Sequence, residues 1–185
     1  MEDLVARKSA LRAEMLRRRA QDHGRGLDAA ANARLISWIG SAEGSVVAGY
    51  MPIRTELSPL HAMTVLSDGA TVAVPVVIGA GEALVFHKWT PEGAMVPGAF
   101  GAAVPESAIA VVPDVVIVPL VAFDAQRGRL GYGGGFYDRT LERLRAANPS
   151  LRVVGFAFDV QEAEAIPLEA TDQPLDAIIT PTRIL

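Results

Sequence analysis

The residues with the clearest chemical potential lie between positions 127 and 138, in the run Arg-Gly-Arg-Leu-Gly-Tyr-Gly-Gly-Gly-Phe-Tyr-Asp. Glycine adopts positive φ at low cost and lets a backbone approach an anion closely. The forked guanidinium groups of Arg127 and Arg129 add donors that suit phosphate. The apolar run 115–122 predicts a strand before the cluster, and residues 136–144 predict a helix after it. Because a helix N-terminus offers free N–H groups and a positive dipole, this order indicates an anion site.

The glycine cluster does not match the common phosphate-binding fingerprints. A P-loop requires Gly-Lys followed by Ser or Thr, whereas this loop continues Gly135-Phe136-Tyr137. The dinucleotide fingerprint requires a third glycine three residues after its second, and Gly133 is followed at that spacing by Phe136. A mobile surface loop would also be rich in glycine. The residues therefore predict either an anion site of a less common type or such a loop.

Further cations lie in the first segment, residues 2–21, whose apolar spacing predicts a helix. Lys8 sits on the apolar stripe of that helix and Arg12 lies at its edge one turn later. Either the stem of Lys8 snorkels along the surface, or both side chains point into the protein toward an anion. The next three arginines are interpreted as a solvated face: Arg17, Arg18 and Arg19.

Carboxylates accompany these cations. Asp138 begins the helix after the glycine loop, where it would either stabilise the helix N-terminus or hold a magnesium ion beside phosphate. Asp172 is a second candidate magnesium ligand. Glu56 follows a predicted strand, at the edge of the sheet where ligands bind in α/β proteins, although a loop glutamate is also commonly solvated. The rings of Tyr132, Phe136 and Tyr137 either stack on a flat ligand or pack on the sheet.

Helix and buried strand alternate along the chain, which predicts an α/β fold with a mainly parallel open sheet and helices on both faces. Further helices are expected at 29–39, capped by Asp28, and at 60–66, capped by Ser58. Right-handed crossovers would bring the Glu56 loop and the glycine loop to one edge of the sheet. The remaining expected elements are strands at 46–51, 71–78 (an edge strand or irregular at Pro75), 84–89 (antiparallel), 152–158 and 176–180, a long excursion at 90–113 and one helical turn at 161–165.

Composition narrows the class of protein. A chain of 185 residues, 50% apolar, is expected to fold as a single domain, residues 1–185. A net charge of −4 argues against a general nucleic-acid or membrane-surface binder. The absence of cysteine removes disulfides and thiolate chemistry. No apolar run reaches the ~20 residues of a membrane span, and the charged N-terminus has no signal-peptide core. We therefore expect a soluble, cytoplasmic protein. We also expect a monomer.

Five blocks of the sequence, in order, resemble the 5-formyltetrahydrofolate cyclo-ligase family, also called 5,10-methenyltetrahydrofolate synthetase, and the match extends over nearly the whole chain. The most specific block is Arg-Leu-Gly-x-Gly-x-Gly-aromatic-Tyr-Asp, residues 129–138. Within it, Phe136 stands where tyrosine is common in the family, and Gly134 where some members have lysine. The other blocks are residues 8–12, 50–56, 118–124 and the ending 167–172 with 176–180.

The resemblance implies an enzyme that uses ATP and magnesium to convert a small-molecule substrate, 5-formyltetrahydrofolate, into 5,10-methenyltetrahydrofolate, with ADP and phosphate as co-products. Transfer of the γ-phosphoryl group to the formyl oxygen would activate the formyl carbon for attack by N10. Phosphoryl transfer depends on positioning and charge neutralisation more than on a covalent catalyst. Arg129, with magnesium, would supply the largest electrostatic contribution.

The resemblance also implies a role for each matching residue. Asp138 and Asp172 would hold magnesium. The ATP contacts would be Lys8, Arg12, Arg129, Leu130, Gly131, Tyr132, Gly133, Gly134, Gly135, Phe136 and Tyr137. The folate contacts would be Met51, Glu56, Tyr132, Gly133, Gly134, Gly135 and Phe136.

Two other functions remain open on the sequence alone. The first is a phosphotransferase with a different acceptor, which would share the ATP site without the pterin pocket. The second is a non-catalytic regulator that binds a folate or a nucleotide. The joint presence of Lys8, Glu56, Arg129 and Asp138 argues against the regulator.

Overall fold

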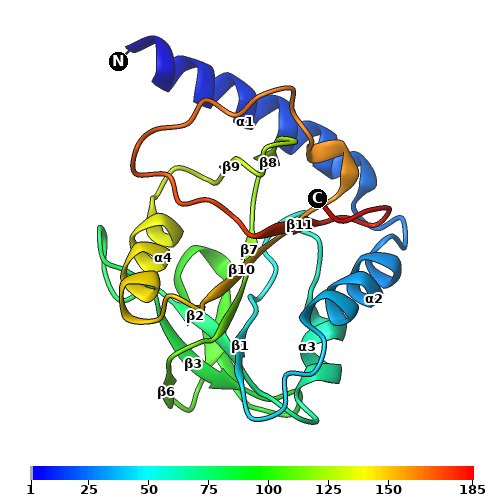
Figure 1. The fold of residues 1–185 in the computed structure, drawn as a ribbon, viewed down its shortest axis with the longest axis vertical. Coiled ribbons are helices and arrows are strands. Elements are labelled where there is room, and N and C mark those ends of the chain that lie inside the picture. Colours follow the sequence, from blue (N-terminus) through cyan, green and yellow to red (C-terminus); the bar gives the residue numbers. More distant parts are fainter. Residues whose placement is uncertain (1) are drawn as a thin grey trace.

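Five apolar runs pair side by side in parallel and form the centre of the structure (Figure 1). The computed structural model describes residues 2–185, whose main sheet has the strand order β11-β10-β7-β1-β2-β3-β6. The parallel strands are β1 (Val46–Ala48), β2 (Thr71–Val76), β7 (Val115–Pro119), β10 (Arg152–Phe156) and β11 (Ala177–Ile179). The antiparallel strands are β3 (Val85–Trp89) and β6 (Ala110–Val111). The predicted mainly parallel sheet and the antiparallel 84–89 strand are both confirmed.

Helices cover both faces of this sheet, as the sequence predicted. The flanking helices are α2 (Asp28–Ile39), α3 (Leu60–Leu66) and α4 (Phe136–Ala147). Leu35 of α2 belongs to a buried cluster with Ile117 on one face, and Leu141 of α4 belongs to a second cluster with Val116 on the other. Alternate residues of β7 thus enter two different cores, as the period of two along a strand requires.

Helix α1 (Glu2–Asp22) covers neither face but crosses the edge where the parallel strands end (Figure 1). Its Met15 is buried against Val121 and Leu130. Leu130 belongs to, and Val121 immediately precedes, a short hairpin that follows β7, formed by β8 (Ala122–Phe123) and β9 (Arg129–Leu130). This packing places α1 beside the loops that follow the central strands. Within residues 2–185, no helix has both the length and the apolar character needed to cross a membrane.

Pro75 does not mark an edge strand, because β2 pairs with β1 on one side and β3 on the other. The reason is register. The last hydrogen bond between β1 and β2 is the one in which the carbonyl of Ala73 accepts the N–H of Gly49. The backbone groups of residue 75 point to the same side of the strand as those of residue 73. The missing N–H of Pro75 therefore points to a side where β1 has already ended, so proline removes no ladder hydrogen bond there.

The two predicted helix caps are wrong in detail. Leu27 occupies the N-cap of α2, and Asp28 instead accepts the N–H of Ser58 at 3.1 Å. Pro59 occupies the N-cap of α3, and the Ser58 hydroxyl accepts the Leu60 N–H only in a long hydrogen bond of 3.4 Å. The side chain of Asp28 thus joins the two helices and does not close its own.

The expected long excursion 90–113 contains regular structure. A second hairpin forms within it from β4 (Met95–Pro97) and β5 (Ala103–Pro105), with a 3₁₀ turn η1 (Ala99–Gly101) at its tip. The expected helical turn at 161–165 lies earlier, as the 3₁₀ turn η2 (Asp159–Gln161). The strand expected at 115–122 ends at Pro119, because the chain then turns into the β8–β9 hairpin.

We expect Leu35→Ala to lower the free energy of unfolding by about 3 kcal/mol, since it removes fully buried carbons and leaves a cavity. The control is Val65→Ala on α3, because Val65 is 41% exposed; it should change the same quantity by less than about 1 kcal/mol. Urea unfolding followed by circular dichroism measures both. Equal losses in the two variants would contradict the assigned core.

Candidate functional site

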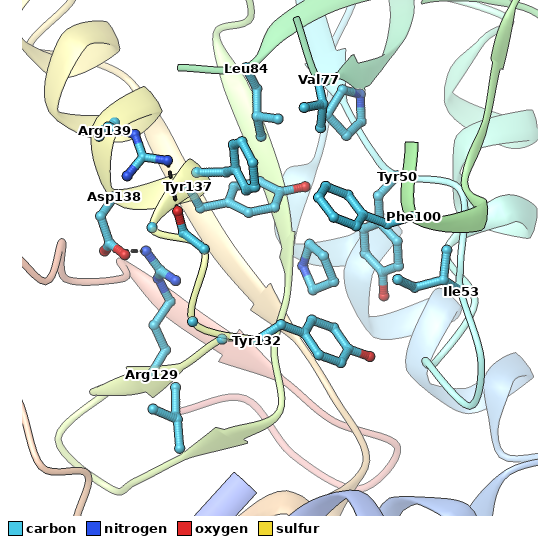
Figure 2. Close-up of a pocket in the computed structure, with 18 of the residues that line it drawn as sticks. Tyr50, Ile53, Val77, Leu84, Phe100, Arg129, Tyr132, Tyr137, Asp138 and Arg139 are labelled. Atoms are coloured by element: carbon cyan, nitrogen blue, oxygen red, sulfur yellow. Dashed lines mark hydrogen bonds and ion pairs between the residues drawn. The ribbon is translucent and has the colours of Figure 1, made fainter. Parts of the chain in front are cut away.

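A cavity of about 620 Å³ opens at the edge of the sheet that α1 crosses. Figure 2 shows Arg129, Asp138 and Arg139 on one side of it and Tyr50, Ile53 and Phe100 on the other. The residues to which the family resemblance assigned a role all line this cavity: Lys8, Arg12, Met51, Glu56, Arg129, Leu130, Gly131, Tyr132, Gly133, Gly134, Gly135, Phe136, Tyr137, Asp138 and Asp172. The structure therefore brings together groups that are up to 164 residues apart in the chain.

Arg129 is a buried cation of the glycine-loop side, only 7% exposed. One of its terminal nitrogens donates to Asp138 Oδ1 at 2.5 Å (Figure 2). Burial lowers the pKa of Arg129, and the nearby charges of Asp138 and Asp172 oppose that shift. Its Nε is also buried and has no hydrogen-bond partner within residues 2–185. A desolvated guanidinium with a spare donor suits an anionic ligand.

Lys8 points into the protein, so the snorkelling interpretation is wrong. Its Nζ lies 2.6 Å from Glu169 Oε2 and 3.2 Å from Asp172 Oδ2. Burial alone would lower the pKa of Lys8, but hydrogen bonds to these two carboxylates raise it. Arg12 also points inward and donates through Nε to the carbonyl of Gly131 at 2.8 Å. Helix α1 thus contributes two cations to the glycine-loop side of the cavity.

Asp138 and Asp172 are the residues of the site that could hold magnesium. Asp138 accepts hydrogen bonds only through Oδ1, from Arg129 and from the backbone of Gln173. Asp172 accepts only through Oδ2, from Lys8 and from the backbone of Glu169. Within the described residues each carboxylate therefore keeps one oxygen free. Residues 2–185 contain no cluster of three or more metal-binding side chains, but magnesium commonly uses one or two carboxylates with phosphate and water.

The glycine loop depends on backbone conformations that suit glycine. Gly133 has φ of 101° and Gly135, the N-cap of α4, has φ of 65°. A Cβ at Gly134 would lie 2.8 Å from the ring of Phe136. The two positions at which this sequence differs from the family pattern are thus close enough that a side chain at 134 would displace the ring at 136. Asp138 makes no capping bond at this helix start.

Glu56 is buried beside several tyrosines and arginines. It is 5% exposed, and its Oε2 accepts the N–H of Ile53 at 2.9 Å. Burial raises the pKa of Glu56, and the backbone bond and the charges of Arg19 and Arg54 oppose the shift. Burial likewise raises the pKa values of the three neighbouring tyrosines, Tyr50, Tyr132 and Tyr137. The solvated-loop interpretation of Glu56 is therefore wrong.

Arg19, which the sequence placed on a solvated face, is fully buried. It donates to Thr55 Oγ1 at 3.0 Å, to the Tyr132 hydroxyl at 2.6 Å and, weakly at 3.5 Å, to the Leu120 carbonyl. Spacings of four, three and four join Lys8, Arg12, Met15 and Arg19 into one helix face, and this pattern was the missed signal. In contrast, Arg17 is exposed, Arg18 is half-buried, and both pair with Glu14, as expected near a solvated face.

Arg127 and Phe100 also differ from expectation. Arg127 does not line the cavity; it is exposed and donates to the carbonyl of Asp176 at 2.7 Å. Phe100, at the tip of the β4–β5 hairpin, does line it, with its ring centroid 5.8 Å from that of Phe136. No sequence spacing connects Phe100 with the glycine loop, so only the fold reveals this apolar wall.

Comparisons with known proteins identify the family and agree with this fold. The model of the 5-formyltetrahydrofolate cyclo-ligase family matches residues 5–181. The 5-formyltetrahydrofolate cyclo-ligase of Mycolicibacterium smegmatis is 32% identical over 151 residues, 76% of this chain and 75% of that protein. The Escherichia coli (strain K12) protein of the same name is 49% identical over 71 residues, 38% of each chain. Matches to the E. coli and Haemophilus influenzae relatives span only 38% and 53% of their lengths.

Solved structures show the same fold. The 5,10-methenyltetrahydrofolate synthetase of Aquifex aeolicus superposes with a TM-score of 0.79 at 29% identity, covering 96% of this chain and 91% of that one. The Mycoplasma pneumoniae 5,10-methenyltetrahydrofolate synthetase gives a TM-score of 0.72 at 22% identity, covering 93% and 97%. The second likeness is one of fold alone. The chain belongs to the 5-formyltetrahydrofolate cyclo-ligase family.

The raised pKa of Glu56 leads to a pH-dependent prediction. Below its ordinary pKa of 4.5 this carboxyl is protonated in both folded and unfolded chains. Between pH 4.5 and the higher pKa of the folded chain, the carboxyl ionises in the unfolded chain but stays protonated in the folded chain, which favours unfolding. We therefore expect the free energy of unfolding of the wild type, relative to Glu56→Gln, to fall across this range and then level off. Glutamine can still accept the Ile53 N–H.

Urea unfolding of both proteins from about pH 4 to about pH 8 measures this difference. Parallel pH profiles for the wild type and Glu56→Gln would contradict the assigned environment of the carboxyl.

Proposed function

We propose that this chain converts 5-formyltetrahydrofolate into 5,10-methenyltetrahydrofolate in a magnesium-dependent reaction that consumes ATP and releases ADP and phosphate. One observation supports this proposal above the others: a single cavity joins a cationic glycine loop to an aromatic pocket with a buried carboxylate. The first half suits a triphosphate and the second a flat, polar heterocycle. The names of the relatives and of the A. aeolicus structure agree with it.

The ATP phosphates would lie along the glycine loop. Lys8 and Arg12 would neutralise phosphate charge from α1, and Arg129 would do so from β9. The backbone of residues 130–137 would supply N–H donors and the start of α4. Asp138 and Asp172 would hold magnesium, which, when bound, neutralises charge that develops on the transferring phosphoryl group.

The folate would occupy the aromatic half. Glu56 would accept from the polar edge of the pterin, and Met51 would contact its flat face. Tyr132 would separate the two halves, because it extends from the glycine loop toward Ile53 (Figure 2). The glycine loop from Tyr132 to Phe136 would then touch both substrates, and the formyl group could meet the γ-phosphate there.

The reaction follows from these positions. The formyl oxygen attacks the γ-phosphorus, the bond to ADP breaks, and the formyl carbon becomes an imidate-like phosphate. N10 then attacks that carbon, closes the ring and loses its proton, and phosphate leaves with the C–O electrons. Arg129 stabilises charge on the transferring group, and the enclosed site positions both partners. A monomeric, cytoplasmic enzyme that binds no nucleic acid remains our prediction.

An absorbance assay for the methenyl product tests the proposal, with purified protein, 5-formyltetrahydrofolate and magnesium, with and without ATP. Product that forms only with ATP supports it. ATP turnover with other acceptors and none with the formyl folate would instead identify a different phosphotransferase. Tight folate binding without any ATP turnover would identify a non-catalytic binder.

Arg129→Ala should lower kcat about 100-fold or more at saturating ATP, because it removes a preorganised donor from the transferring phosphoryl group. The matched control is Arg127→Asn, two residues earlier, which lies outside the cavity; asparagine tolerates the φ of 66° found there. The control should stay within about threefold of the wild type, well inside the effect of losing one donor. Near-normal kcat in Arg129→Ala would refute the assigned role.

A further inference from the structure

Arg54 is a cavity-lining cation that no polar group engages. It lies in the connection between β1 and α3, and within residues 2–185 its guanidinium has neither a hydrogen-bond acceptor nor an ion-pair partner. Its Cζ lies 5.4 Å from the ring centroid of Tyr132, at cation–π distance. The other cavity-lining cations all have polar partners: Lys8, Arg12, Arg129 and Arg139. Arg54 therefore has donors available for a ligand.

The backbone at Arg54 is held in an unfavourable conformation. Its φ is 55°, in the left-handed region that disfavours a side chain with a Cβ. Neighbouring contacts impose this conformation: Glu56 accepts the N–H of Ile53 and donates its own N–H to the Ile53 carbonyl, and Arg19 binds Thr55. Such strain concentrates at sites of function. The turn thus fixes the direction in which the Arg54 side chain leaves the chain.

The position of Arg54 favours one of the two substrates. The buried carboxylate of Glu56, two residues away, would repel a triphosphate on this side of Tyr132. The cations that suit ATP are those of the glycine-loop side. Arg54 is exposed at the rim of the cavity, where the solvent-facing end of a ligand would lie. A reduced folate ends there in a glutamyl group, whose carboxylates suit a forked guanidinium.

We propose that Arg54 binds the glutamyl carboxylates of the folate substrate and so determines the preference for glutamylated over unglutamylated substrate. This inference rests on the proposed function and extends it by one recognition residue. The aromatic ring of Tyr132 supports the guanidinium from one side, leaving its outer edge for the carboxylates. Because Arg54 contacts no reacting atom, it acts on affinity and leaves the chemical step unchanged.

A matched pair of substrates isolates this contact. 5-Formyltetrahydrofolate and 5-formyltetrahydropteroate share the reacting atoms, but the second lacks the glutamyl group. For the wild type, the KM of the pteroate should exceed that of the folate about tenfold, the value of one favourable charge contact. In Arg54→Gln the KM ratio should fall to within about threefold of unity, with kcat for the folate unchanged within the same factor.

Two further variants control for the loss of an arginine elsewhere and for destabilisation of the fold. Arg17→Gln removes an exposed arginine that pairs with Glu14 away from the cavity, and it should keep the wild-type KM ratio. Arg54→Asn places a residue that tolerates positive φ at the strained position, so its melting temperature should equal or exceed that of the wild type while the KM ratio still falls.

The outcomes are distinct. A KM ratio in Arg54→Gln and Arg54→Asn equal to that of the wild type would overturn the proposal while leaving the proposed function intact. If the wild type converts neither compound with ATP, the proposed function fails and this inference fails with it. A reduced ratio in both Arg54 variants, with the Arg17→Gln ratio unchanged, supports it.

Discussion

The site depends on one buried guanidinium, that of Arg19. It ties α1 to Thr55 in the loop after β1 and to Tyr132 in the glycine loop, and so holds together two segments from different strands. Among residues 2–185 no carboxylate forms an ion pair with Arg19. Glu56 is nevertheless close enough for the charge of Arg19 to oppose the rise in the pKa of Glu56. A buried charge is costly to dehydrate, and Arg19 is stabilised only by neutral acceptors. Without these hydrogen bonds, the loop after β1 and the glycine loop should therefore both loosen.

The cavity that results is electrostatically divided. On the glycine-loop side, Lys8 and Arg129 are each matched by carboxylates that could also serve magnesium. MgATP would therefore enter a site in which these cations are already paired with carboxylates. The cations would then contact the phosphates, and Asp138 and Asp172 would bind the metal. On the other side of Tyr132, Glu56 sits in an aromatic and poorly solvated environment. If the proposed function holds, this division would give each substrate a compartment of matching charge.

The sequence revealed those parts of the site that depend on local order along the chain. The glycine loop with its flanking strand and helix, and the Glu56 loop after β1, were predictable because parallel strands bring such loops to one edge. Arg19 was misjudged because a run of three arginines suggests a solvated face, while burial of the third depends on partners 36 and 113 residues away. Phe100 was missed for the same reason, and the Asp28 cap was wrong because Ser58 competes for its carboxylate.

The most direct test of this account is the affinity of Arg19→Met for 5-formyltetrahydrofolate, measured by calorimetry beside the wild type. Methionine retains much of the volume and removes the charge and every donor. We predict a Kd at least about tenfold weaker, equivalent to one lost positioned contact, in a variant whose circular dichroism shows that it is folded. An unchanged Kd in such a folded variant would contradict the claim that Arg19 assembles the folate side of the site.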